Sequence, residues 1–137
     1  MKRSPNSDRR SDCPLSIALE IFGDRWTLLI LRDLMLKGLR TFKEFQESGE
    51  HIASNILSVR LHQMQGLGIV TGERSPTDAR VVTYRPTAKG LDLLPVLVEI
   101  VLWSAHYEKT AAPRKLIERM RKDREGFIRE IRERFAG

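Results

Sequence analysis

Residues 53–66, with the sequence ASNILSVRLHQMQG, place hydroxyl, amide and imidazole side chains at the spacing of one helix face. Such groups donate to and accept from the edges of base pairs in a DNA major groove. Residues 51–72 contain no acidic side chain that would repel phosphate groups. The outward face of this predicted helix is therefore a candidate base-reading surface, formed by Ser54, Asn55, Ser58, Val59, Arg60 and His62.

Two simpler interpretations of this segment stay open. A solvated helix whose polar residues contact nothing would show the same pattern, although a neutral surface helix usually carries glutamate. Arg60 lies beside the outward face, where it would either contact a phosphate or pair with an acid of a core helix. Exposed ion pairs and phosphate contacts look the same in a sequence, so both roles remain open for Arg60.

A second group of basic and hydroxyl side chains frames a predicted hairpin turn, formed by Arg74, Ser75, Thr77 and Arg80. A basic hairpin beside a base-reading helix favours contact with the DNA backbone or the minor groove. The alternative is an edge hairpin that its charges keep soluble. Thr41 and Lys43 begin a short helix and offer a hydroxyl and an ammonium group to one phosphate, whereas helix capping alone would also explain Thr41.

Cys13 is the single cysteine of the chain, which excludes an internal disulfide and suits a reducing cytosol. It directly precedes a helix that Pro14 opens, and the positive end of a helix dipole favours a reactive thiolate. Cys13 is therefore a redox-sensing candidate, which would form an intersubunit disulfide or an adduct. An inert, half-buried cysteine is the alternative.

Enzymatic and metal chemistry find little support in the sequence. His51, His62 and His106 lack metal-ligand spacing with one another or with Cys13. We find no glycine-rich phosphate loop, no paired carboxylates suited to a pocket and no nucleophile elbow. We expect no cofactor, no metal and no enzymatic activity.

Length and composition indicate one small domain of 137 residues with a formal net charge of +6. The positive excess lies at the two ends of the chain, so the overall charge is weak evidence for a nucleic-acid partner. No apolar segment follows the polar N-terminus as in a signal peptide. The most apolar stretch, 91–103, is too short to span a bilayer and contains charged residues and a proline. We therefore expect a cytoplasmic protein without membrane contact.

The positioning elements follow from periodicity and capping signals. The sequence predicts a helix from Pro14 to Gly23, a central core helix over 25–37 capped by Asp24, and a short helix that begins with a capping box at Thr41. In the helix over 53–66, four apolar residues are expected to face the core: Ile56, Leu57, Leu61 and Met64.

The helical period then ends, and two short β-like runs follow. Residues 69–74 and 80–85 predict a hairpin, and residues 88–107 predict a long apolar helix that Pro95 bends. Residues 113–137 predict a charged amphipathic helix. The fold class is thus mainly α (α+β): a winged helix-turn-helix with extra N- and C-terminal dimerisation helices.

This order of elements predicts three regions: a disordered N-terminal arm over 1–12, a DNA-binding and dimerisation domain over 13–112, and the C-terminal helix over 113–137. The helix over 88–107 is too apolar for the surface of a monomer, which indicates a homodimer. Burial by the C-terminal helix of the same chain is the alternative. The predicted interface consists of Leu15, Leu19, Leu94, Leu97, Val98, Val101 and Leu102.

Segments between Cys13 and about Tyr107 resemble the HxlR family of bacterial winged-helix regulators. The segments that carry the resemblance are CPLSIALEIFGDRWTLLILRDL, RTFKEFQ, ILSVRLHQMQGLGIV and VVTYRPTAKGLDLLPVL. Ala53-Ser54 stands where the family often has Ser-Pro, and residues 113–137 extend past the usual end of the family domain.

The resemblance implies a homodimer that binds double-stranded DNA as a transcriptional regulator, with repression the commoner outcome. It also implies dimerisation through the terminal helices, and several relatives sense oxidants or electrophiles through a cysteine at the place of Cys13. The alternative function is a winged-helix module that binds other proteins through the tail over 113–137 and does not bind DNA directly.

Overall fold

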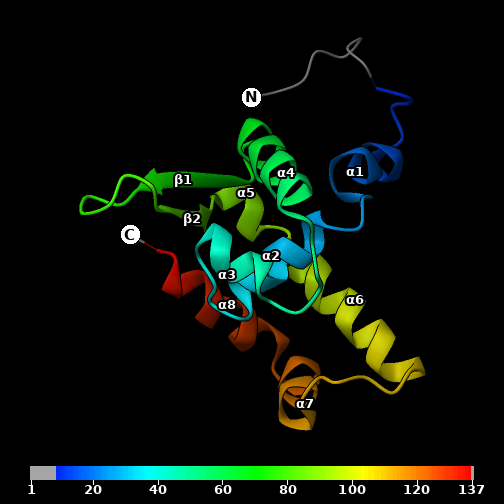
Figure 1. Ribbon diagram of the computed structural model, residues 1–137. Coiled ribbons are helices and arrows are strands. Elements are labelled where there is room, and N and C mark those ends of the chain that lie inside the picture. Colours follow the sequence, from blue (N-terminus) through cyan, green and yellow to red (C-terminus); the bar gives the residue numbers. More distant parts are fainter. Residues whose placement is uncertain (1–8, 137) are drawn as a thin grey trace.

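The computed structural model describes residues 9–136, so residues 1–8 of the predicted disordered arm lie outside the described part. The elements in chain order are α1 (Pro14–Phe22), α2 (Thr27–Met35), α3 (Phe42–Gln46), α4 (Ser54–Gly66), β1 (Val70–Arg74), β2 (Val82–Pro86), α5 (Ala88–Leu91), α6 (Leu94–Tyr107), α7 (Arg114–Lys122) and α8 (Arg124–Arg134). Figure 1 shows the β1–β2 hairpin extending away from the helical body, with α4 above it. The predicted class, a mainly helical winged helix-turn-helix, is confirmed.

The two strands of the hairpin are antiparallel, with Val70 opposite Pro86 and Arg74 opposite Val82. The predicted hairpin is confirmed, but its second strand begins later than the sequence indicated. The reason is a wider turn, in which the Ser75 N–H donates to the Val81 carbonyl at 2.8 Å. The hairpin therefore has a tip of polar residues between two short strands.

The hydrophobic core is centred on α2, as its apolar circumference predicted. Leu31, Leu34 and Met35 of this helix are completely buried. The side chains that surround them come from α3, α4, β1 and α6, and include Phe45, Leu57, Leu61, Met64, Val70, Leu94, Leu97 and Val98. The core therefore fixes the positions of both helices of the helix-turn-helix and of the hairpin.

The start of α2 corrects the sequence prediction. Asp24 accepts hydrogen bonds from the backbone N–H groups of Trp26 and Thr27, both at 2.9 Å, and from the Thr27 hydroxyl at 2.6 Å. The Asp24 carboxylate thus binds the backbone N–H groups that have no partner inside the helix, and residues 24–26 form a turn. The helix therefore begins at Thr27 and not directly after Asp24.

The predicted single helix over 88–107 is also wrong, because the chain forms α5 and then α6 with a break at residues 92–93. Pro95 has no N–H for an intrahelical bond, and a proline is tolerated only in the first turn of a helix. Pro95 accordingly lies at the start of α6 and marks a new helix instead of a bend. Within residues 9–136, no helix is both long and apolar enough to cross a membrane.

The C-terminal extension forms α7 and α8 rather than the one predicted helix. Asp123 separates them and caps α8 by accepting a hydrogen bond from the Gly126 N–H at 3.1 Å. Both helices contribute buried side chains to the same core as α2, namely Ile117, Met120, Phe127 and Ile131, and Phe135, the C-cap of α8, is buried there as well. The extension therefore stabilises the winged-helix body, and Figure 1 shows that its end returns to the side of the hairpin.

Candidate nucleic-acid interface

Helix α4 presents a continuous polar face to solvent. Leu57, Leu61 and Met64 are buried against the core, as predicted. The opposite face is exposed along the helix and includes Ser54, Asn55, Ser58, Val59 and His62. Ile56 corrects the prediction, because it is 38% exposed and faces outward rather than into the core. The exposed face therefore combines hydrogen-bonding groups with small apolar surfaces, the combination that reads base edges and thymine methyl groups.

The end of α4 is fixed by a glycine. Gly68 has φ of +73°, a left-handed conformation that favours glycine. The N–H of Gly68 donates to the Gln65 carbonyl, and the N–H of Ile69 donates to the Met64 carbonyl at 2.9 Å. This pair of bonds is a Schellman motif, which ends the helix and directs the chain into β1.

The segment around α5 holds the carbonyl groups that follow α4. Thr87 Oγ1 donates to the Gly68 carbonyl at 2.5 Å, and Lys89 Nζ donates to the Leu67 carbonyl at 2.8 Å. Gly90 packs directly beneath, since a Cβ atom at this position would lie 2.2 Å from the Ile69 carbonyl oxygen. The sequence indicated Thr87 as the N-cap of the helix after β2, and this is confirmed because Thr87 Oγ1 accepts from the Gly90 N–H at 3.1 Å. The contacts of Lys89 and Gly90 with the end of α4 were not predicted.

The start of α3 carries the predicted capping box. Thr41 Oγ1 accepts from the Glu44 N–H at 3.2 Å, and Glu44 Oε1 accepts from the Thr41 N–H at 3.0 Å. Hydrogen bonds from the backbone N–H groups of Arg40 and Thr41 hold the pKa of Glu44 below its usual value. Lys43 is exposed beside this cap. Capping explains Thr41, while the Lys43 ammonium group remains directed to solvent.

The capped start of α3 is joined to the wing. The Tyr84 N–H of β2 donates to the Arg40 carbonyl at 2.8 Å, and Thr41 forms a β-bridge with Thr83. Because β1 packs against α4 and pairs with β2, the start of α3, the wing and α4 form one connected surface. The residues predicted to contact phosphate therefore lie on elements that the backbone holds together.

The tip of the wing is stabilised by local bonds. Arg80 contacts both carboxylate oxygens of Asp78, with Nε to Oδ1 at 3.1 Å, and this hydrogen bond keeps the pKa of Asp78 below its usual value. Arg74 donates to the Ala79 carbonyl at 2.6 Å. The hydroxyl groups of Ser75 and Thr77 lie 3.1 Å apart. The tip is thus a closed hydrogen-bonded loop that carries two exposed arginines.

Arg60 on α4 contacts both an acid before the core helix and a neighbouring residue of its own helix. Its Nε is 3.7 Å from Asp24 Oδ2, and its Nη1 donates to Gln63 Oε1 at 2.7 Å. Asp24 belongs to the turn before α2, so the ion pair connects the core helix to α4. These contacts favour a positioning role for Arg60 over a direct contact with phosphate.

The loop between α3 and α4 is held by a second ion pair. Glu50 accepts from Arg32 Nη1 at 2.9 Å, and this bond lowers the pKa of Glu50. Arg32 also donates to Asp33, which is 3% exposed. His51 follows in a left-handed conformation with φ of +58°. The turn of the helix-turn-helix is therefore fixed to α2 by side chains rather than by backbone bonds alone.

Cys13 is exposed at the start of α1, where it is the N-cap residue. Its N–H donates to Ser11 Oγ at 3.2 Å, and no side chain caps the helix. The thiol is therefore accessible to solvent in the protomer.

The residues predicted for a dimer interface lie in two different environments. Leu94, Leu97 and Val98 are buried inside the protomer, because α6 packs against α2 and α7. Val101 and Leu102 are half-buried. The apolar side chains that remain open to solvent on α1 and α6 are Leu15, Leu19, Ile100, Trp103 and Tyr107. Of the predicted interface residues, Leu15 and Leu19 are therefore the two that are exposed in the protomer.

Comparison with known proteins places this geometry in a family. The model of the HxlR-like helix-turn-helix family matches residues 21–112, from the end of α1 to the linker after α6. The HTH-type transcriptional regulator sll1512 of Synechocystis sp. is 29% identical over 86 residues, which are 63% of this chain and 63% of that relative. The chain therefore spans less than two thirds of the length of this relative.

Solved structures agree with the family match. The crystal structure of PA1607, a protein proposed to be a transcription factor, matches with a TM-score of 0.67 and 34% sequence identity. The match covers 77% of this chain and 72% of PA1607. The reduced form of the transcriptional regulator YodB from Bacillus subtilis has a TM-score of 0.57 and 30% identity, and the match covers 71% of this chain and 95% of YodB. The chain therefore belongs to the HxlR-like helix-turn-helix family.

Proposed function

We propose that this protein is a homodimeric transcriptional repressor that binds a palindromic DNA site through α4 and the wing. The observation that carries the proposal is the exposed face of α4, which is free of acidic side chains and adjoins a wing with two exposed arginines. Ser54, Asn55 and Ser58 occupy the first turns of α4, the part of a recognition helix that contacts base edges. Lys43 and the wing residues would then contact phosphate groups on either side.

The homodimer rests on the apolar surface of α1 and α6. Leu15 is 68% exposed and Trp103 is 65% exposed, and large apolar side chains at such exposure mark interaction sites. A two-fold axis through this surface would pair two copies of the same patch. Two recognition helices could then enter successive major grooves about 34 Å apart, which requires a palindromic site.

A response to oxidants through Cys13 is the regulatory part of the proposal. The exposed thiol at the start of α1 adjoins the proposed dimer surface, which begins at Leu15. Oxidation to a disulfide between two copies, or formation of an adduct with an electrophile, would change the packing of α1. YodB, to which this chain is similar, has been solved in a reduced form.

Capture of DNA tests the function directly. The purified chain is incubated with fragmented genomic DNA of its source organism, and the strongest bound fragment is titrated against salt. We expect a palindromic site whose affinity exceeds that for bulk DNA by at least about a thousandfold and falls steeply with salt. Loss of this binding in the double variant Ser58→Ala, Arg80→Gln supports the assigned surface, and Lys115→Gln on α7 is the control with a matched loss of charge.

Recovery of random fragments alone would contradict sequence-specific binding and favour the protein-interaction module.

The homodimer is tested separately by sedimentation, with Trp103→Ser expected to produce monomers. Repression is tested by transcription in vitro from a template that carries the captured site. Treatment of the complex with a quinone or a peroxide tests Cys13, and Cys13→Ser should keep its DNA affinity under the same treatment.

A further inference from the structure

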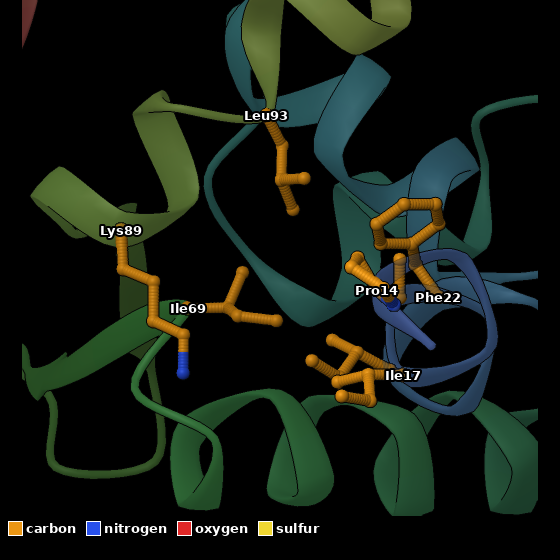
Figure 2. A pocket seen from close by; sticks show the side chains of 8 residues that line it. Pro14, Ile17, Phe22, Ile69, Lys89 and Leu93 are labelled. Carbon is orange, nitrogen blue, oxygen red and sulfur yellow. The ribbon is translucent and has the colours of Figure 1, made fainter. Parts of the chain in front are cut away.

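A partly open cavity of about 350 Å³ lies between α1 and the residues that follow α4 and β2 (Figure 2). Its lining is apolar apart from one lysine and consists of Pro14, Ile17, Ala18, Ile21, Phe22, Ile69, Lys89 and Leu93. This volume falls in the range of small-molecule sites, in which an apolar wall carries a few polar groups that orient the ligand. The cavity therefore has the size and composition of a ligand site.

Helix α1 has two apolar sides, and only one of them faces the cavity. Ile17 and Ile21 line the cavity and are half-buried, whereas Leu15 and Leu19 do not line it and are exposed. Residues two positions apart lie on opposite sides of a helix. Leu15 and Leu19 therefore lie outside the lining of the cavity in the protomer.

Lys89 supplies the charge of the cavity. In Figure 2 its side chain lies on the opposite side of the cavity from Pro14 and Phe22. Lys89 Nζ donates one hydrogen bond, to the Leu67 carbonyl at 2.8 Å, and an ammonium group has three donors. None of the lining residues is acidic. The cavity thus offers an apolar wall together with one cation that has donors left for an anion.

We propose that this cavity binds a small apolar monoanion, an aromatic carboxylate of about two fused rings. The rings lie between the α1 side chains and Ile69, and the carboxylate accepts from Lys89 at the edge of the cavity. Apolar burial supplies most of the affinity, and the exposed ion pair with Lys89 supplies the preference for an acid over its amide.

The ligand would act on the recognition helix through the same lysine. Lys89 holds the carbonyl at the end of α4, and Thr87 and Gly90 pack against the two residues that follow. A bound carboxylate competes with the Leu67 carbonyl for the Lys89 ammonium group. If Lys89 moves toward the cavity, the end of α4 loses this hydrogen bond and its position changes. This effect on DNA affinity rests on the proposed function, whereas binding of the ligand does not.

Calorimetry of the full chain without DNA tests the binding with two probes, naphthalene-2-carboxylate and its uncharged amide. We expect the acid to bind about fivefold to tenfold more tightly than the amide. In Lys89→Gln the two probes should bind equally, while Lys109→Gln, which changes an exposed lysine of the linker after α6, should keep the preference. Ala18→Phe fills the cavity and should abolish binding of both.

Equal affinity for acid and amide in the unaltered chain would overturn the proposal, and this comparison needs no variant to fold. Unchanged affinity in a folded Ala18→Phe variant would also overturn it, because the probe would then bind elsewhere. Thermal unfolding of each variant establishes that it is folded. Binding of the acid to a chain that fails to bind DNA would support the cavity and contradict only the proposed function.

Discussion

Asp24 and Arg60 connect the turn before α2 to the middle of α4, with 3.7 Å between Asp24 Oδ2 and Arg60 Nε. The same carboxylate accepts three hydrogen bonds at the start of α2. Partial burial opposes ionisation, but the bonds from Thr27 and Trp26 and the charge of Arg60 outweigh it and keep the pKa of Asp24 below its usual value. One side chain therefore sets the position of two helices as long as it is ionised.

Acid should weaken this connection. Because the pKa of Asp24 is lowered on folding, its stabilisation is present above the ordinary carboxyl range and is lost as the pH falls below about 4. We expect Asp24→Asn to reduce the free energy of unfolding by about 1 kcal/mol near neutral pH and by less at about pH 3. Urea unfolding at both pH values measures the difference. As a control, Glu118→Gln, which changes an exposed acid on α7, should leave the free energy of unfolding nearly unchanged at both pH values. If Asp24→Asn lowered the free energy of unfolding equally at both pH values, the stabilising role of the ionised Asp24 carboxylate would be contradicted.

Two glycines should respond in opposite ways to the same substitution. A Cβ atom at Gly90 would lie 2.2 Å from the backbone oxygen of Ile69, whereas a Cβ atom at Gly66 would have no neighbour within 4 Å. We expect Gly90→Ala to cost about 2 kcal/mol, since backbone must move, and Gly66→Ala to stabilise the helix by roughly 0.5 kcal/mol. Thermal unfolding compares them. A harmless Gly90→Ala would mean that α5 does not pack closely beneath the end of α4.

The C-terminal extension should prove necessary for the stability of the wing. Phe135 is 8% exposed, and the Arg40 guanidinium carbon lies 4.9 Å from the centroid of its ring. Arg85 of β2 donates to the Phe135 carbonyl at 2.9 Å. We expect Phe135→Ala to cost about 3 kcal/mol in urea unfolding, and Arg134→Ala, an exposed neighbour, to stay within about 0.5 kcal/mol. Similar small effects for both would show that the end of α8 does not hold the wing.

The elements of the winged helix could be predicted because their signals are local. The capping box at Thr41, the buried positions of α4 and the polar turn between the two strands each depend on residues close together in the chain. The breaks at residues 92–93 and at Asp123 depend on how a proline and an acid compete with helix continuation. Tertiary packing decides whether a helix continues or breaks at such a residue, so the sequence alone does not show where the helices end.

The parts of the candidate site that escaped prediction are long-range contacts. The pairing of Arg60 with an acid of the core helix was predicted only as one of two open roles, because nothing near Arg60 in the sequence singles out Asp24. Nothing near Leu67 indicates that Lys89 holds its carbonyl. Ile56 was placed in the core because apolar residues at helical spacing usually are, yet the core beneath α4 is already filled by Leu57 and Leu61. These features follow from tertiary packing.

The wing provides the last prediction, because Arg80 must leave Asp78 before it can contact a phosphate. Asp78 binds the guanidinium through two hydrogen bonds in the free protein. Asp78→Asn removes this competing negative charge from the tip. We expect Asp78→Asn to raise the affinity for DNA, and Arg80→Gln to lower it and to reduce the slope of log affinity against log salt by about 1.

A double-variant cycle at low and at moderate salt measures both effects together. If Asp78 acts by restraining Arg80, adding Asp78→Asn to Arg80→Gln should give much less gain than adding it to the unaltered chain. Lys122→Gln, an exposed charge at the end of α7 with the same loss of one positive charge, should leave the slope unchanged. An equal gain from Asp78→Asn with and without Arg80 would mean that Asp78 acts by repelling phosphate directly and does not restrain Arg80. An unchanged salt slope in Arg80→Gln would mean that Arg80 lies outside the DNA contact.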